Sequence, residues 1–259
     1  MPVQPRPSAA VMLLRDTRAS MEIFMVRRSS KSAFMPDVYV FPGGAVAEED
    51  HHIELQPDLC RPIVPTGADP EERTRLGTGL RAAALRELFE EANILLAYTN
   101  QQSMLAIEES SLARFQLHRQ NFHDQQGSME QLLRVEQLLL ATDQLYYFSH
   151  WITPEASPRR YDTHFFLASG PTSQEAAYDQ IETTDGIWIG AGQALERYAA
   201  GTFDLAFPTI YQLRELAVFT SVAEALSATE QRYVQTHRPV IVKEAGESQI
   251  ILPEETSQS

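Results

Sequence analysis

Residues 86–91 read Arg-Glu-Leu-Phe-Glu-Glu, and they lie downstream of a Phe-Pro-Gly-Gly sequence at residues 41–44. On a helix, Glu87, Glu90 and Glu91 are spaced i, i+3 and i+4, so their carboxylates project from one side. Three clustered anions repel one another unless a cation lies among them, and oxygen ligands favour hard ions. The stretch therefore predicts a helix that binds Mg²⁺ or Mn²⁺. The alternative is a solvated helix face with an i, i+4 ion pair.

Bulk properties limit the classes of protein to consider. The chain has 259 residues and a hydrophobic content of 43%, which is ordinary for a soluble globular protein. Its formal net charge of −14 argues against a nucleic-acid partner, because a polyanion would be repelled. No apolar run is long enough to span a membrane and no signal pattern is visible, so we expect a cytoplasmic protein without a membrane partner. The single cysteine, Cys60, argues against disulfides within the chain and against a cysteine-rich zinc site.

The N-terminal part reads as strands. Apolar runs at 11–15 and 22–27, separated by polar residues 16–20, predict a β-hairpin. Residues 38–41 predict a third strand, and we expect Pro42 and the two glycines after it to end that strand in a turn.

The middle of the chain combines a loop with helices. Residues 45–79 are rich in charge, proline and glycine and predict a long surface loop. The helix with the three glutamates is expected from about 79 to 94, with Asn93 as a left-handed residue at its end. Apolar residues at helical intervals over 104–143 predict two more helices, separated near residues 125–128.

The C-terminal part alternates strands and helices. Helical patterns cover 191–199 and 209–226. We therefore expect an α+β fold with a mixed sheet, forming one domain over residues 1–259. A loop insertion is expected at about 48–78 and a helical insertion at about 101–144. Aromatic and β-branched residues predict strands at 146–152, 161–167 and 186–189.

The sequence resembles the Nudix hydrolases. Their signature is G-x5-E-x7-R-E-U-x-E-E-x-G-U, where U is a bulky apolar residue, and residues 86–94 match its second half except that Asn93 replaces the glycine. Segments 149–154, 158–167 and 207–209 resemble a branch that includes peroxisomal coenzyme A diphosphatases and bacterial relatives. The resemblance implies the α/β/α Nudix sandwich and cleavage of a nucleoside-linked diphosphate.

The first half of the signature is interrupted by an insertion. Counting forward from Gly44 places its glutamate at Asp50, whereas counting back from Arg86 places it at Thr78. The assignment of metal ligands therefore depends on the second half alone.

The resemblance assigns roles around the metal. Glu87, Glu90 and Glu91 would hold Mg²⁺ or Mn²⁺, and Glu87 with Arg86 would form the catalytic centre, Arg86 orienting Glu87. The carbonyl of Gly43 would complete the coordination shell.

The resemblance also calls for a further acid after the signature, acting as metal ligand or general base. Glu182 is the first choice and Glu175 the second, against the alternative that each is an exposed loop carboxylate. Gly44 would offer a bare backbone group to the substrate phosphate.

Two arginines are candidates for phosphate binding. Arg159 and Arg160 precede a strand, and guanidinium groups match phosphate oxygens; the alternative is an ion pair with Asp162. His150 and His164 lie on aromatic-rich strands, where hydrogen-bonded structural histidines are expected.

The leading functional hypothesis is a Mg²⁺- or Mn²⁺-dependent pyrophosphohydrolase acting on coenzyme A or acyl-coenzyme A, a small nucleoside diphosphate derivative. ADP-ribose or a nucleotide sugar is the runner-up substrate. A hypothesis of another class is a catalytically silent Nudix-fold sensor or scaffold, which the interrupted signature supports and the intact glutamates oppose. Dimers are frequent in this family, so a homodimer stays open.

Overall fold

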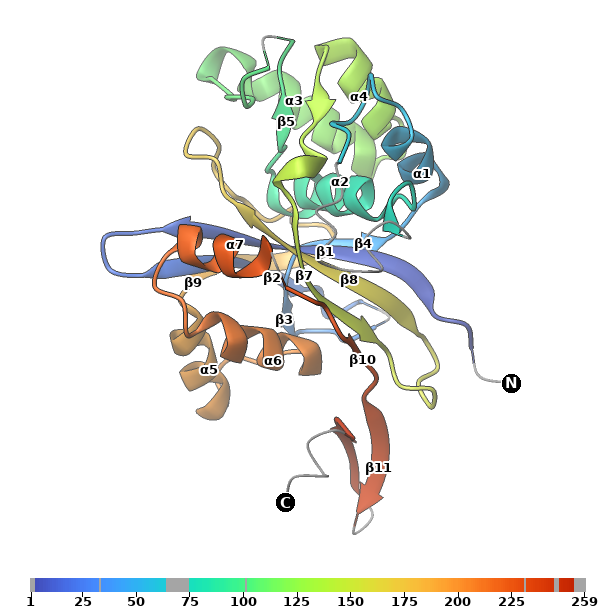
Figure 1. Ribbon diagram of the computed structural model, residues 1–259, viewed down its shortest axis with the longest axis vertical. Helices are drawn as coiled ribbons and strands as arrows, with labels where there is room; N and C mark the ends of the chain where they lie inside the picture. Colours follow the sequence, from blue (N-terminus) through green and yellow to red (C-terminus); the bar gives the residue numbers. More distant parts are fainter. Residues whose placement is uncertain are drawn as a thin grey trace.

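A mixed sheet with helices on both faces forms the centre of the molecule (Figure 1). The structure is a computed structural model and describes residues 3–32, 34–63, 75–100, 102–230, 232–244 and 247–253. The expected α+β sandwich with a mixed sheet is confirmed. The extent of the domain and of its two insertions stays a prediction.

The main sheet has eight strands in the order β10-β7-β8-β1-β2-β3, with β4 paired to β1 and β9 paired to β2. Pairs β5-β6 and β11-β12 form two small sheets. The strands are β1 Arg6–Asp16, β2 Met21–Arg28, β3 Tyr39–Val40, β4 Gly43–Ala45, β5 Ala97–Tyr98, β6 Leu139–Leu140, β7 Tyr146–Ile152, β8 Tyr161–Ser169, β9 Thr183–Ile189, β10 Thr236–His237, β11 Val240–Glu244 and β12 Glu247–Ile251.

Helices α1 to α4 lie on one side of the sheet, and α5 and α6 lie on the other (Figure 1). None of the helices in the described ranges is long and apolar enough to cross a membrane. The helices are α1 Glu48–Glu54, α2 Leu80–Ala92, α3 Glu109–His123, α4 Met129–Glu136, α5 Ala191–Ala199, α6 Phe207–Leu216 and α7 Val222–Glu230.

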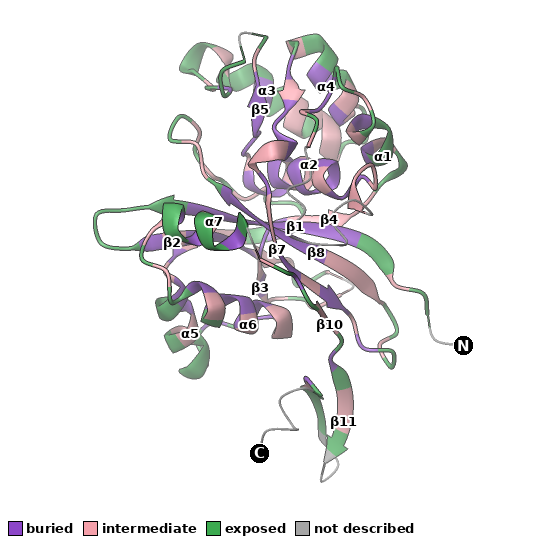
Figure 2. Ribbon diagram, viewed as in Figure 1, coloured by how far each residue is buried: buried purple, intermediate pink, exposed green. Residues whose placement is uncertain are grey.

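The central strand β1 divides the core in two. Its alternate residues Ala9, Val11 and Leu13 pack on the α2 side, whereas Ala10, Met12 and Leu14 pack on the opposite side. Both sets are buried because β1 pairs with β8, β2 and β4 and has helices on both faces, as Figure 2 shows. The predicted β1-β2 hairpin is confirmed.

Helix α2 carries the glutamates and lies against β1 and β4. Leu85, Leu88 and Phe89 are fully buried, and the helix ends at Asn93, whose φ of 61° is left-handed. This helix and its cap are therefore as predicted. The helices expected around a break near 125–128 are also present as α3 and α4.

Three local expectations were wrong. Residues 48–54, expected in a loop, form α1, where Asp50 accepts the Ala47 N–H at the helix start; residues 64–74 of that loop lie outside the described residues. The helix expected over 209–226 is two helices. A new N-terminus forms where Thr220 donates through its N–H and hydroxyl to Glu224. The glycines at 43–44 belong to strand β4 rather than to a turn.

Candidate active site

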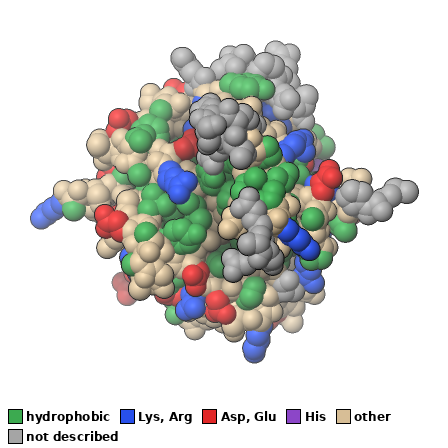
Figure 3. Space-filling view, turned by 90° about the horizontal axis from the view of Figure 1, so that it is seen from below, with side chains coloured by type: hydrophobic (Ala, Val, Ile, Leu, Met, Phe, Trp, Pro, Cys, Tyr) green, Lys and Arg blue, Asp and Glu red, His purple; other side chains and the backbone are tan. Residues whose placement is uncertain are grey.

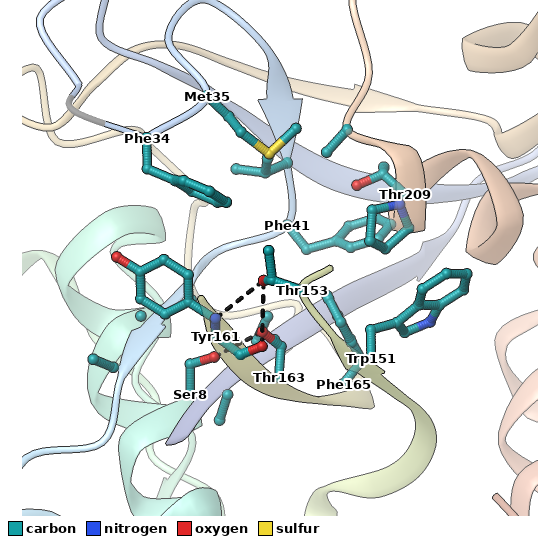
Figure 4. A pocket seen from close by; sticks show the side chains of 18 of the residues that line it. Ser8, Phe34, Met35, Phe41, Trp151, Thr153, Tyr161, Thr163, Phe165 and Thr209 are labelled. Atoms are coloured by element: carbon teal, nitrogen blue, oxygen red, sulfur yellow. Dashed lines mark hydrogen bonds between the residues drawn. The ribbon is translucent and has the colours of Figure 1, made fainter. Parts of the chain in front are cut away.

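A cavity of about 600 Å³ opens where α2 and β4 approach strands β7 and β8. Acidic side chains from α2 line one part of the cavity, and aromatic side chains line another. Figure 4 shows the aromatic part. Phe34 and Tyr161 face each other at 5.1 Å between ring centroids, and Phe41, Trp151 and Phe165 lie across from them. A charged end and an apolar end thus share one cavity.

The C-terminal hairpin β11-β12 projects below the main body (Figure 1). Pro239, just before it, and Ile250 within it line the same cavity. In the view of the molecule from below, hydrophobic side chains gather around the middle (Figure 3). The hairpin thus extends the apolar wall of the cavity.

The acidic cluster consists of Glu87, Glu90 and Glu91, and all three residues line the cavity. Arg86 donates from Nη1 to Glu87 Oε1 at 2.8 Å and to Glu90 Oε1 at 3.1 Å. The Gly43 N–H donates to Glu91 Oε2 at 2.9 Å. All three predicted metal ligands thus line one cavity from α2, as their spacing requires.

Arg86 is held by Asp50, one of the two positions that counting along the interrupted signature reaches. Its Nε and Nη2 donate to the two carboxylate oxygens of Asp50 at 2.9 and 3.0 Å, and Nη2 also donates to the Ala45 carbonyl. Asp50 is fully buried, so it lies behind Arg86 rather than in the cavity. Counting forward from Gly44 therefore reaches a residue that meets Arg86 in the folded protein, although 36 positions separate the two in the chain.

The electrostatics of the cluster favour a cation. Burial raises the pKa of Glu87 to about 7, against the lowering effect of Arg86, and the nearby charge of Glu90 raises it further. Burial and the Glu87 charge also raise the pKa of Glu91 well above its ordinary value. Negative charge in the cluster thus exceeds what Arg86 neutralises, and the donors are all oxygens. This set fits a divalent ion such as Mg²⁺ or Mn²⁺.

Both glycines lie at close contacts, Gly43 against the β1 backbone and Gly44 against the Glu87 carboxylate. A Cβ on Gly44 would lie 2.3 Å from Glu87 Oε1, and one on Gly43 would lie 2.5 Å from the Cβ of Ala10. Glycine at 44 therefore lets Glu87 approach the β4 backbone. The predicted metal contact of the Gly43 carbonyl and phosphate contact of Gly44 stay predictions, although both residues line the cavity.

The two candidates for the further acid are placed differently. Glu182 lines the cavity, and its charge raises the pKa of both Glu87 and Glu91. Both residues are exposed, but Glu175 is not among the described residues that line the cavity, and its backbone carbonyl accepts from the Asn93 side chain at 3.2 Å. The geometry therefore favours Glu182.

The structure does not bring Arg159 and Arg160 into the cavity. Arg160 donates to the carbonyls of Thr153 and Val3 at 3.0 and 2.8 Å, so its guanidinium fixes backbone, and Arg159 is exposed. The described part of the cavity wall instead includes Arg28. Sequence reasoning did not propose Arg28 as a phosphate ligand.

Arg28 is fixed by its own loop. Its Nε donates to the Phe34 carbonyl at 3.1 Å, and its Nη2 donates to the Ser32 hydroxyl at 2.8 Å. Arg28 and the acidic cluster line the same cavity, and the positive charge of Arg28 opposes the rise in the pKa of Glu91 that burial and the Glu87 charge cause. The signal available in the sequence was its position at the end of the second apolar run.

His150, Asp162 and His164 form a separate polar group on β7 and β8. Their ligand atoms lie within 4.8 Å of one another. His150 contacts Asp162 through Nε2 and Thr236 through Nδ1, whereas His164 Nδ1 pairs with the Tyr147 hydroxyl at 2.8 Å. The two histidines are thus hydrogen-bonded, as predicted. Asp162 pairs with His150 rather than with the two arginines before it.

Comparison with known proteins finds a matching family model and similar proteins in other organisms. Residues 52–216 match the family model described as the NUDT19 Nudix domain. The chain is 25% identical over 240 residues to acyl-coenzyme A diphosphatase NUDT19 of Xenopus laevis, covering 81% of this chain and 63% of the relative. It is 29% identical over 248 residues to the Gallus gallus protein of that name, covering 83% and 66%. The chain therefore spans less than two thirds of the length of these two relatives.

A solved structure shares the fold. The NUDIX hydrolase from Alicyclobacillus acidocaldarius aligns with a TM-score of 0.69 at 24% sequence identity, covering 86% of this chain and 96% of that one.

Proposed function

Because this chain belongs to the Nudix family, in the branch of the NUDT19 Nudix domain, we propose that it is a metal-dependent hydrolase of coenzyme A or acyl-coenzyme A. The family match covers the second half of the signature from which the resemblance was first inferred. The observation that best supports the activity is the acidic cluster on α2, which shares a cavity with an aromatic wall.

The reaction would be attack of water on one phosphorus of the diphosphate, with cleavage of the bond to the bridging oxygen. Mg²⁺ or Mn²⁺, when bound, would neutralise phosphate charge and lower the pKa of the attacking water. Glu87, Glu90 and Glu91 would hold the ion, and Arg86, fixed by Asp50, would hold Glu87 in place. The resulting charge neutralisation would be the main source of rate acceleration.

Two further residues of the cavity would act on the substrate. Glu182 would accept the proton of the attacking water, because its carboxylate lies near the cluster. Arg28 would contact phosphate oxygens, since its guanidinium lies in the wall of the same cavity. The first assignment decides between Glu182 and Glu175, and the second puts Arg28 in the phosphate-binding role that the sequence suggested for Arg159 and Arg160.

The aromatic wall favours coenzyme A over the polar runner-up substrates. Coenzyme A attaches a nucleobase and a long, partly apolar arm to its diphosphate, whereas ADP-ribose and nucleotide sugars have a polar sugar in place of the arm. Phe34 and Tyr161 would pack on flat or apolar groups, and Trp151 and Phe165 would extend that surface. The curated relatives are named acyl-coenzyme A diphosphatases, which agrees with this choice.

The silent-sensor hypothesis loses its main support. It drew on the interrupted first half of the signature, but Asp50 meets Arg86 in the folded protein. The enzyme hypothesis therefore accounts for more of the site.

A substrate panel tests the proposal. Coenzyme A, a long-chain acyl-coenzyme A, ADP-ribose and a nucleotide sugar would be incubated with the protein and Mg²⁺ or Mn²⁺, and the products identified by mass. We expect the phosphoadenosine fragment to be released from the coenzyme A compounds. Rapid release of AMP from ADP-ribose with inert coenzyme A would contradict the proposed substrate, and inertness toward all four would contradict the proposed activity.

A further inference from the structure

We infer that the helical insertion positions the active site through Arg119 of α3, which joins the acidic helix to the loop that presents Glu182. The inference goes one step beyond the proposed function and rests on it, because it assumes that Glu182 acts beside the acidic cluster. It makes Arg119 a positioning residue, since its contacts are to backbone rather than to substrate.

Arg119 forms a bridge between two backbone segments. Its Nε donates to the Glu90 carbonyl at 2.8 Å, and its Nη2 donates to the Ala177 carbonyl at 2.8 Å. Glu90 belongs to the acidic cluster, and Ala177 lies five residues before Glu182 in the loop 171–182. One planar guanidinium thus fixes the distance between the metal-binding helix and this loop.

The same loop is tied to the end of α2 at three more points. The Ala177 N–H donates to the Ala92 carbonyl at 3.0 Å, and Asn93 Nδ2 donates to the Glu175 carbonyl at 3.2 Å. Gln174 pairs with the backbone of Leu95 in both directions, at 2.9 and 3.0 Å. These contacts give Asn93 a role that the glycine of the family signature cannot have. Asn93 keeps the left-handed φ and adds a donor to the loop.

The far end of the loop is a fixed turn that presents Glu182. The carboxylate of Asp179 accepts the N–H groups of Ile181, Glu182 and Thr183 at 3.1, 3.1 and 2.8 Å. The Glu182 carbonyl accepts the Ser29 N–H at 2.9 Å, so its backbone is held from both sides. The position of the Glu182 backbone beside the acidic helix is therefore set by these contacts, and Arg119 is the contact supplied by the insertion.

Loss of this bridge should affect the chemical step more than substrate binding. Misplacement of a catalytic group by about 1 Å can cost about 100-fold in rate. Groups that bind the substrate, such as Arg28 and the aromatic wall, are not contacted by Arg119. A lower kcat with a nearly unchanged KM is therefore the expected signature.

The experiment compares Arg119→Met with Arg114→Met in the full chain. Arg114 lies on the same helix and pairs with Glu136 at 2.9 Å, so the control removes one arginine and one surface ion pair from α3 without touching the loop. With coenzyme A as substrate, we expect Arg119→Met to lower kcat by about 10- to 100-fold with KM within about threefold. Arg114→Met should leave both unchanged.

A double variant tests whether the fall in kcat caused by Arg119→Met depends on Glu182. Glu182→Gln lowers kcat by itself, and adding Arg119→Met to it should lower kcat only slightly further, because the positioned group is already gone. Fully multiplicative losses would contradict the inference. Equal kcat in the wild type and in Arg119→Met would also contradict it.

Hydrogen exchange of the backbone amides of residues 177–183 provides a readout that does not require activity. Faster exchange in Arg119→Met than in Arg114→Met is expected, and equal exchange would contradict the bridge. If Arg119→Met does not fold, Asn93→Gly tests the same loop by removing one tie. A wild type inert toward all substrates would refute the proposed function, whereas an active wild type with an unaffected Arg119→Met would refute only this inference.

Discussion

Asp50 and Arg86 lie 36 positions apart in the chain and meet through two hydrogen bonds to one carboxylate. Arg86 in turn donates to Glu87 and Glu90, so one buried acid fixes the guanidinium that contacts two of the proposed metal ligands. Charge-assisted, bidentate contacts of this kind are geometrically specific. At the scale of single residues, the geometry of the site thus depends on Asp50, which lies outside the cavity, as well as on the glutamates that line it.

Gly44 offers a second test at this scale. Gly44→Ala would place a methyl group 2.3 Å from the Glu87 carboxylate, which must then move. We expect hydrolysis to fall by about 100-fold or more, with weaker Mn²⁺ binding, because the displaced group is a proposed metal ligand. Measurements of kcat/KM and Mn²⁺ affinity check this.

Gly192→Ala is the matched control. Gly192 lies in α5, and a Cβ there would meet no atom within 4 Å. The same substitution should leave activity unchanged and raise stability by about 0.5 to 1 kcal/mol, since alanine favours the helix. Undiminished activity in Gly44→Ala would show that Glu87 does not need its observed position.

At the scale of elements, the strands β7 and β8 place two histidines and an aspartate side by side. His150 and His164 stack at 4.0 Å between ring centroids, and burial lowers the pKa of His164 to about 3, with the nearby His150 lowering it further. His164 is therefore neutral in the folded protein at pH values where an unfolded histidine is charged. The unfolded state then binds more protons, and stability must fall as the pH falls.

The stability of the sheet should show this titration. As the pH falls from the ordinary histidine pKa of 6.5 to the folded value of about 3, the unfolded state binds a proton that folded His164 does not. This difference lowers the free energy of unfolding by up to about 1.4 kcal/mol per pH unit. In His164→Gln, the free energy of unfolding should therefore fall less steeply from pH 6 to pH 4 than in the wild type, as measured by urea unfolding. Identical slopes would mean that His164 takes up its proton without unfolding. His52→Gln is the control, because 52% of the His52 side chain is exposed.

Elements with strong local signals were predictable, and those that depend on distant partners were not. The β1-β2 hairpin, α2 and its Asn93 cap follow from periodicity and end residues. Strand β4 contains two glycines and no strand-forming pattern, and it exists because β1 pairs with it. The roles expected for Arg159 and Arg160 depended on where a strand end would point, and Arg160 instead fixes backbone carbonyls. The Arg119 bridge has no local signature, and the sequence marks Arg28 only by its position at the end of an apolar run.

At the scale of the whole molecule, charge makes a cation necessary for the proposed reaction. The chain has a formal net charge of −14, and a diphosphate is itself an anion. In the described wall of the cavity, Glu87, Glu90, Glu91 and Glu182 outnumber Arg28 and Arg86, so the side chains alone offer little attraction to an anionic substrate. A divalent ion would reverse the local field and allow the substrate to bind. The fold provides both ends of the site, acids from α2 and aromatic groups from β7, from β8 and from the loops that carry Phe34 and Phe41.

The most direct test is the rate of coenzyme A hydrolysis as a function of Mn²⁺ concentration, in the wild type and in Glu90→Gln/Glu91→Gln. The double variant keeps the shape of the site and removes two charges, so its circular dichroism should match that of the wild type. We expect wild-type hydrolysis to be absent without metal and to rise to saturation with Mn²⁺, and hydrolysis by the variant to be lost at every concentration. Hydrolysis that persists in a folded double variant, or that needs no metal in the wild type, would contradict the account.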